Sequence, residues 1–220
     1  MWYKKITSTL IVLVASSDLL FARAGGGSGG GAARGIGLII GLINIALISY
    51  FVYHKNKKAK KIINSIHNED TFWDYEKMID FTNDTFLRMQ HAWMERNMDL
   101  VKDIVTERLY LDYQKKLNWQ KVKHEQNIIE DITIKKTEII GFEDRLGKDN
   151  DSFTVYIKGR LLDYTISDKT QKIYTNKDKS KTAFVDLYYF VRQNDQWYLD
   201  KIDNDVTLGK IFKAKEIVDQ

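Results

Sequence analysis

Residues 153–166 read Phe-Thr-Val-Tyr-Ile-Lys-Gly-Arg-Leu-Leu-Asp-Tyr-Thr-Ile, a run rich in β-branched and aromatic residues. Such a run predicts a β-strand. Similar runs occupy Ile128–Ile134, Thr137–Phe142, Thr182–Arg192 and Trp197–Ile202. The connections between these runs are polar, and residues 193–195 are short enough for a hairpin. The sequence therefore predicts an antiparallel sheet.

The residues before these strands carry a helical pattern. Apolar residues recur every three or four positions through Phe72–Glu95, which predicts a helix with a capping box at Thr71 to Asp74. Asn97 either ends that helix or caps a short one at Met98–Val105, and Thr106 opens a third. Helices followed by strands are typical of the α+β class, in which N-terminal helices pack on one face of a curved antiparallel sheet.

Composition and charge restrict the classes of function. The 220 residues are 44% hydrophobic and 29% charged, which is ordinary for a folded chain, and they include no Cys and no Pro. Disulfides, thiolate metal sites and cysteine nucleophiles are therefore excluded. Residues 1–61 hold nine Lys and Arg against one Asp, so the total of +4 leaves residues 62–220 at −4. An acidic domain disfavours nucleic acid as a partner.

The N-terminal residues have the pattern of a membrane segment. Two lysines, an apolar stretch and Ala22-Arg23-Ala24 stand in the order of a secretory signal, so we predict a signal peptide at residues 1–24, with an uncleaved first membrane helix as the alternative. A glycine-rich linker is predicted at 25–34. Residues 35–53 carry no formal charge, and a helix of this length spans a hydrocarbon layer of about 30 Å.

Aromatic and basic residues mark the end of the predicted span. Interfacial aromatic residues and cytoplasmic lysines anchor such helices, so the C-terminal domain is expected in the cytosol, behind a basic segment and linker at 54–74. The predicted membrane anchor comprises Tyr50, Phe51, Tyr53, Lys55, Lys57, Lys58, Lys60 and Lys61. Gly37 and Gly41 stand four residues apart, and this spacing leaves a homo-oligomer paired through the helix as an alternative.

Few residues are arranged for catalysis. The four histidines show no metal-binding spacing, and no cofactor or metal is expected. Two strand pairs combine a carboxylate with a tyrosine, Asp163 with Tyr164 and Asp186 with Tyr188. Neighbours on a strand face opposite sides, whereas residues two apart share one side. Only Asp186 and Tyr188 are therefore placed to act together.

Several segments resemble the Tim44-like domain family, which comprises the C-terminal domain of a mitochondrial inner-membrane translocase subunit and its bacterial relatives. The helical segments are Met89-Gln90-His91-Ala92-Trp93, Asn97-Met98-Asp99-Leu100 and Val105-Thr106-Glu107-Arg108-Leu109-Tyr110, and the strand segments are Gly159-Arg160-Leu161-Leu162-Asp163-Tyr164 and Gln196-Trp197-Tyr198-Leu199-Asp200-Lys201-Ile202. The resemblance covers residues 75–204 and leaves 205–220 as a C-terminal tail. Asn97 departs from the acidic residue expected there.

The resemblance implies a cone-like sheet around an apolar pocket, similar to nuclear transport factor two, and a role in membrane-protein translocation or assembly. It implies a non-enzymatic binding module at the bacterial inner membrane, single-pass if the signal is cleaved, that contacts lipid, membrane proteins or translocation and assembly factors. The candidate pocket residues are Phe86, Trp93, Tyr110, Tyr164, Asp186, Tyr188 and Trp197. An enzyme that uses Asp186 and Tyr188 on a small apolar substrate is the alternative.

Overall fold

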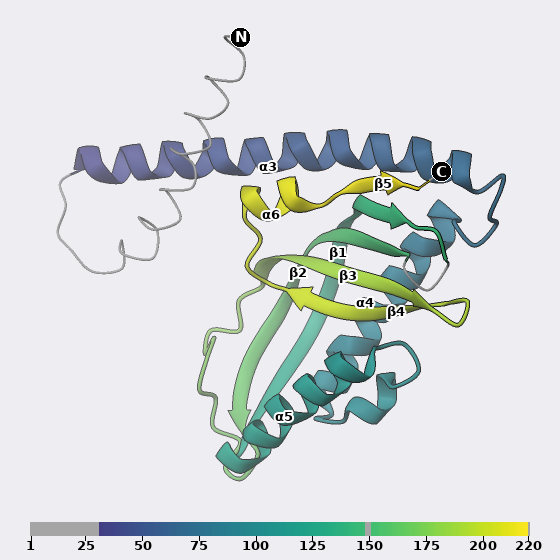
Figure 1. Ribbon diagram of the computed structural model, residues 1–220. Helices are drawn as coiled ribbons and strands as arrows, with labels where there is room; N and C mark the ends of the chain where they lie inside the picture. Colours follow the sequence, from purple (N-terminus) through teal and green to yellow (C-terminus); the bar gives the residue numbers. More distant parts are fainter. Residues whose placement is uncertain (1–30, 148–150, 220) are drawn as a thin grey trace. The chain divides into compact units, whose positions relative to one another are not determined.

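The computed structural model describes residues 31–147 and 151–219, with side chains from residue 40 onward. The predicted signal peptide and residues 25–30 of the predicted linker lie outside this range. The chain forms two compact units, one containing residues up to His54 with Thr207–Lys213, the other Lys55–Val206 with Ala214–Gln220. In chain order the elements are α3 (Gly31–Ile66), α4 (Tyr75–Met94), the 3₁₀ helix η1 (Met98–Val101), α5 (Glu107–Lys123), β1 (Glu125–Asp144), β2 (Ser152–Ser167), β3 (Thr182–Gln193), β4 (Gln196–Asp203), α6 (Leu208–Lys213) and β5 (Glu216–Val218) (Figure 1).

The first unit contains the N-terminal part of α3 together with α6. The rings of Phe51 and Phe212 meet edge to face with centroids 4.6 Å apart. No helix in the part of the chain that the structure describes is long and apolar enough to cross a membrane. The span predicted at residues 35–53 therefore stays a prediction.

In the second unit, the C-terminal part of α3 is followed by three helical segments, each of which begins at a polar cap. The side chains of Asp74, Asn97 and Thr106 each accept a hydrogen bond from a backbone N–H two or three residues later. Asp74 rather than Thr71 caps α4, so the helix begins at Tyr75. The predicted helix at residues 98–105 is a single 3₁₀ turn.

The sheet has the strand order β4-β3-β2-β1-β5. Strands β1 to β4 pair antiparallel and β5 pairs parallel to β1, so the α+β class and the antiparallel sheet are confirmed. The strands predicted at 128–134 and 137–142 are one strand of 20 residues, β1, interrupted by register shifts, and Asp131 has a φ of 52° beside the first. Such bulges bend a strand, and β1 and β2 curve in Figure 1.

The β3–β4 connection is the predicted hairpin. Only Asn194 and Asp195 separate the strands, with φ values of 48° and 55°. Two consecutive residues with positive φ are typical of a type I′ turn, in which Asn and Asp are favoured.

The predicted tail at 205–220 contains α6 and β5. Strand β5 pairs with residues 142–144 of β1, and the Phe142 N–H donates a hydrogen bond to the Lys215 carbonyl at 2.7 Å. A strand of three residues is too short to show a periodicity of two.

Aromatic rings form the centre of the hydrophobic core. The ring of Phe153 stacks on the ring of Phe190 with centroids 4.6 Å apart. The ring of Phe153 also meets the ring of Trp197 edge to face, with centroids 4.7 Å apart. Trp73, fully buried, meets Trp197 at 5.3 Å. This cluster joins the α3–α4 connection to the sheet.

Candidate functional site: a pocket between the helices and the sheet

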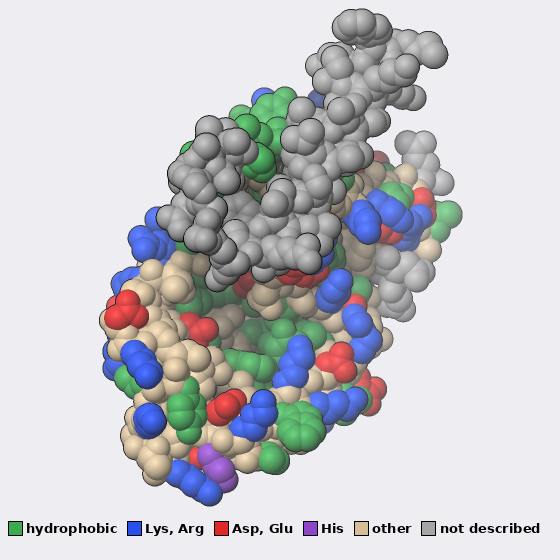
Figure 2. Space-filling view, turned by 90° about the vertical axis from the view of Figure 1, so that its left-hand side faces the viewer, with side chains coloured by type: hydrophobic (Ala, Val, Ile, Leu, Met, Phe, Trp, Pro, Cys, Tyr) green, Lys and Arg blue, Asp and Glu red, His purple; other side chains and the backbone are tan. Residues whose placement is uncertain are grey.

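A pocket of about 570 Å³ lies between α4, α5 and the sheet. Its walls mix apolar and aromatic side chains with a few polar groups. The residues that line it are Met89, Gln90, Trp93, Tyr113, Lys116, Asn127, Ile129, Leu161, Asp163, Thr182, Ala183, Phe184, Val185, Asp186, Tyr188, Ile202 and Asn204. Figure 2, seen from the left of Figure 1, shows a hollow with hydrophobic side chains at its floor and charged side chains around it.

Strand β3 contributes six residues to the lining of this pocket, among them Phe184, Asp186 and Tyr188. Phe184, Asp186 and Tyr188 are two residues apart, so they share one face of the strand. Asp163 also lines the pocket and Tyr164, its neighbour on β2, does not. The alternation predicted that these two neighbours face opposite sides, but Tyr164 rather than Asp163 was among the predicted pocket residues.

Asp186 is the most deeply placed acidic group of the pocket. It is 6% exposed, and the Asn204 amide donates a hydrogen bond to its Oδ1 at 2.8 Å. Burial raises the pKa of Asp186, the Asn204 hydrogen bond opposes that rise, and the charge of Asp203 adds to it. No ion pair to Asp186 forms among residues 31–147 and 151–219. The same residues contain no group of three or more His, Asp or Glu that could hold a metal ion.

We expect Asp186→Asn to be more stable than the wild type at pH 7, because an amide carries no charge to desolvate. The folded pKa of Asp186 lies above its unfolded value, so the wild type gains stability as the pH falls through the folded pKa. The difference in free energy of unfolding should therefore narrow between pH 7 and about pH 4, measured by urea unfolding.

Asp103→Asn is the matched control for this pH series. The hydrogen bond from Arg88 lowers the pKa of Asp103, so this variant should be less stable than the wild type at pH 7, with a deficit that shrinks as the pH falls. If Asp186→Asn behaved in the same way as this control, Asp186 would not be the desolvated charge described above.

Two tyrosines and a tryptophan form the aromatic wall of the pocket. The rings of Trp93 and Tyr113 meet edge to face with centroids 5.6 Å apart. Burial, with the charges of Asp186 and Asp112, raises the pKa of Tyr113 to about 12. Burial also holds the pKa of Tyr188 well above its ordinary value. Both tyrosines therefore keep their protons at neutral pH and offer aromatic surface with a hydroxyl donor.

Gly159 supports the pocket wall from β2. A Cβ at this position would lie 2.6 Å from the ring of Phe184 and 2.4 Å from the Thr133 carbonyl oxygen. Phe184 in turn stacks on Phe86 with centroids 5.1 Å apart. A side chain at position 159 would therefore displace Phe184, a pocket residue.

We expect Gly159→Ala to lower the free energy of unfolding by about 1–3 kcal/mol, the usual cost of overpacking. Urea unfolding measures this change. Gly209→Ala is the control, because the nearest atom to its Cβ is the Thr207 hydroxyl at 3.8 Å, and this change within helix α6 should not lower the free energy of unfolding. Equal effects of the two changes would contradict the close approach at Gly159.

The seven predicted pocket residues divide into two groups. Trp93, Asp186 and Tyr188 line the pocket. Phe86 is fully buried behind the pocket wall, and Trp197 belongs to the core. Tyr110 donates its hydroxyl to Asp99 Oδ1 at 2.7 Å, and the ring of Tyr164 faces the ammonium of Lys179 at 4.6 Å. The pocket does not include these four residues among its lining.

Three of the predicted anchor lysines make contacts inside the second unit. Lys55 Nζ donates to the Ala214 carbonyl at 2.6 Å and lies 3.4 Å from Glu216, which also pairs with Lys58. Lys60 pairs with Glu76 at 2.6 Å. Lys57 and Lys61 are exposed, and in the first unit Tyr50 and Tyr53 contact the ring of His54. The membrane-anchoring role of these residues stays a prediction.

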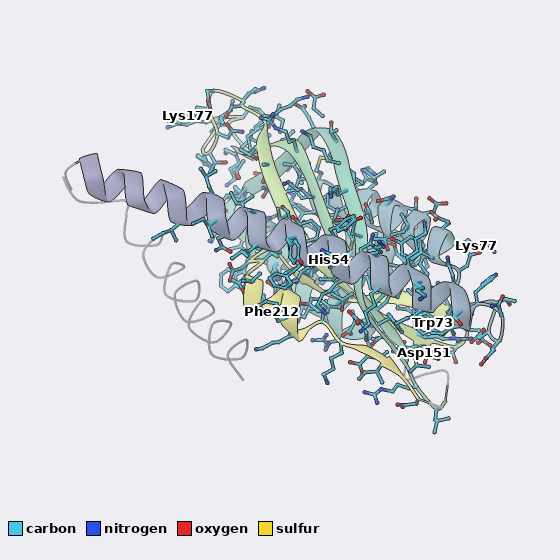
Figure 3. All side chains as sticks on the ribbon, turned by 90° about the horizontal axis from the view of Figure 1, so that it is seen from above. His54, Trp73, Lys77, Asp151, Lys177 and Phe212 are labelled. Atoms are coloured by element: carbon cyan, nitrogen blue, oxygen red, sulfur yellow. The ribbon has the colours of Figure 1, made fainter. Side chains whose placement is uncertain are left out.

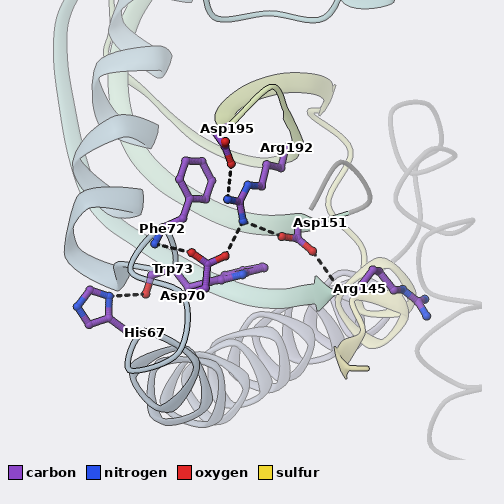
Figure 4. A network of polar contacts seen from close by, with 8 residues as sticks. All are labelled: His67, Asp70, Phe72, Trp73, Arg145, Asp151, Arg192 and Asp195. Carbon is purple, nitrogen blue, oxygen red and sulfur yellow. Dashed lines mark hydrogen bonds and ion pairs between the residues drawn. The ribbon is translucent and has the colours of Figure 1, made fainter. Parts of the chain in front are cut away.

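Sequence reasoning missed Arg192, a buried cation among the residues that the structure describes. It is 1% exposed; its Nη1 pairs with Asp70 at 2.8 Å and Asp151 at 3.1 Å, and its Nη2 with Asp195 at 2.7 Å (Figure 4). The guanidinium carbon lies 3.8 Å from the ring centroid of Phe72. No sequence signal joins these residues, because Asp70 is 122 positions from Arg192.

This network lies at one end of the sheet, beside a second pocket of about 540 Å³ that Phe72, Arg192 and Trp197 help to line. In Figure 3, Trp73 and Asp151 lie at this end of the sheet. Lys177, in the β2–β3 connection, lies at the opposite end. The first pocket therefore stands apart from the Arg192 network, since the two share no lining residue.

Comparisons with known proteins agree with the resemblance seen in the sequence. The model of the Tim44-like domain matches residues 59–204, and the chain belongs to this family. No curated protein matches the chain. Among solved structures, it is similar to the intermembrane space region of the chloroplast protein ARC6, with a TM-score of 0.43 and 6% identity over 59% of this chain and 95% of that one. A de novo designed β-sheet protein matches with a TM-score of 0.32 and 9% identity over 59% of this chain and 88% of that one.

Proposed function

We propose that the chain is a non-enzymatic, membrane-associated binding module, which holds a segment of a membrane protein, a lipid or a translocation or assembly factor in the pocket between α4, α5 and the sheet. The observation that supports this most is the pocket itself, whose walls combine apolar and aromatic side chains with convergent polar groups, as ligand sites do. Membership of the Tim44-like family is consistent with such a role.

The exposed apolar side chains of α3 support the membrane association. Leu42 is 67% exposed, Ile43 50% and Ile45 58%, and clustered exposed apolar residues mark membrane or protein contacts. Anchoring in the bacterial inner membrane with the domain in the cytosol is the finer form of this proposal. The full chain should then stay with membranes through a high-salt wash, and recovery in the soluble fraction would contradict it.

Photo-crosslinking tests the binding function. A photoreactive residue in place of Lys116, at the pocket, should give adducts in cells, and the same residue in place of Lys123 should not. Both lysines lie on α5, and Lys123 does not line the pocket, so the pair separates pocket contacts from contacts with the outer surface. Equal adducts from both positions would contradict the proposal.

One observation favours the enzymatic alternative: Asp186 and Tyr188 both line the pocket. A carboxylate of raised pKa in an apolar site can act as a general base beside a tyrosine acid. Such a base would exchange the α-hydrogens of a small ketone with deuterium from the solvent, and Asp186→Asn would abolish the exchange. Lack of exchange across a panel of small ketones would favour the binding module.

A further inference from the structure

Resting on the proposed function, we infer that the pocket recognises an alkylammonium group, and that the lysine side chain of a bound protein segment supplies it. A lysine side chain combines an apolar chain of four methylene groups with a terminal cation. The pocket offers both features, since its walls contain apolar and aromatic side chains and the buried Asp186 carboxylate forms no ion pair within residues 31–147 and 151–219.

The two carboxylates of the pocket are held by neutral groups. The Asn204 amide donates to Asp186, and the Asn127 amide donates to Asp163 at 3.0 Å. Across the described chain neither carboxylate forms an ion pair, whereas the buried Asp151 pairs with Arg192. Burial of a carboxylate destabilises a protein unless a cation pairs with it. Asp186 is therefore a binding site for a cationic group of the ligand.

The net charge of the pocket lining also favours a cationic ligand. The lining contains two carboxylates, Asp163 and Asp186, and one lysine, Lys116, so it carries one net negative charge that a singly charged ligand would balance. The Lys116 ammonium lies 4.2 Å from the ring centroid of Tyr113, and so this aromatic wall already accommodates a lysine cation. Trp93 extends the same wall.

Titration of the full chain in mild detergent with n-butylammonium and with 1-butanol tests the inference, since the two probes share an apolar chain and differ in charge. The indole N–H signal of Trp93 in NMR spectra reports binding. The wild type should bind the cation about tenfold more tightly, a difference of about 1.4 kcal/mol. Asp186→Asn should bind both probes equally. Asp112→Asn, which removes a charge near Tyr113 but outside the pocket lining, should keep the preference.

Equal binding of both probes by the wild type would overturn the inference and leave the pocket standing as a binding site. Loss of the preference in Asp112→Asn would also overturn it, because the effect would then come from overall charge. If neither probe bound, the inference would fail, and crosslinking from position 116 would decide separately whether the pocket binds anything.

A second arm identifies the source of the ammonium group. The capped peptide Leu-Lys-Leu should displace n-butylammonium, whereas the same peptide with norleucine in place of lysine should not. Displacement by short-chain phosphatidylethanolamine without displacement by the lysine peptide would overturn the assignment to lysine.

Discussion

Arg192→Met is expected to lower the free energy of unfolding by about 3–5 kcal/mol, because it leaves a buried carboxylate without its cation. Asp151 is 2% exposed and its ion pair with Arg192 at 3.1 Å would be lost, together with the pair to Asp70. Urea unfolding of the full chain in mild detergent measures the loss. The deficit should shrink as the pH falls, because protonation removes the uncompensated charge of Asp151.

Two further variants show whether the buried charge is the cause. Arg108→Met removes an arginine whose side chain is 61% exposed and paired with Asp200, so it should cost no more than about 1 kcal/mol. Asp151→Asn added to Arg192→Met should recover part of the loss, because both charges are then gone. A loss in Arg192→Met no greater than in Arg108→Met would contradict the network as a source of stability.

Phe86→Ala is the second large effect, with an expected loss of about 3–5 kcal/mol, typical of a buried phenylalanine replaced by alanine. Phe86 is fully buried, stacks on Phe184 at 5.1 Å and lies 5.8 Å from Tyr188, so its removal opens a cavity behind two pocket residues. The same urea series measures the loss.

Leu87→Ala is the control for this cavity. Leu87 follows Phe86 on α4 and is 46% exposed, so truncation there should cost less than about 1 kcal/mol. Had Phe86 lined the pocket, as the sequence predicted, its truncation would chiefly enlarge the ligand space. Similar small effects of the two changes would favour that earlier prediction.

The periodicity of hydrophobic residues predicted those helices and strands that bury one face over a long stretch of sequence. Helix α4 and strands β2 and β3 were predicted for this reason, and the hairpin followed from Asn194 and Asp195. The single strand β1 was predicted as two because bulges such as that at Asp131 interrupt its alternation. Strand β5 forms through long-range pairing with β1, which three residues cannot signal.

Alternation along β3 predicted one part of the candidate site, and Trp93 was the further lining residue among the seven predicted pocket residues. Alternation alone placed Asp186 and Tyr188 together on β3. The partner of Asp186, Asn204, lies beyond β4, and the aromatic wall comes from Trp93 on α4 and Tyr113 on α5. These groups meet only after the helices pack on the sheet, and tertiary packing of this kind leaves no local pattern in the sequence.

The central claim is that the pocket between α4, α5 and the sheet takes the ligand. Thr182 is an exposed residue of the pocket lining and shares the face of β3 that carries Phe184 and Asp186, so Thr182→Trp should fill the pocket with little effect on the core. The most direct measurement is the yield and mass of the adducts from a photoreactive residue at position 116, with and without this change. Adducts that disappear on filling the pocket are the expected result, and adducts of unchanged yield and mass would contradict the claim.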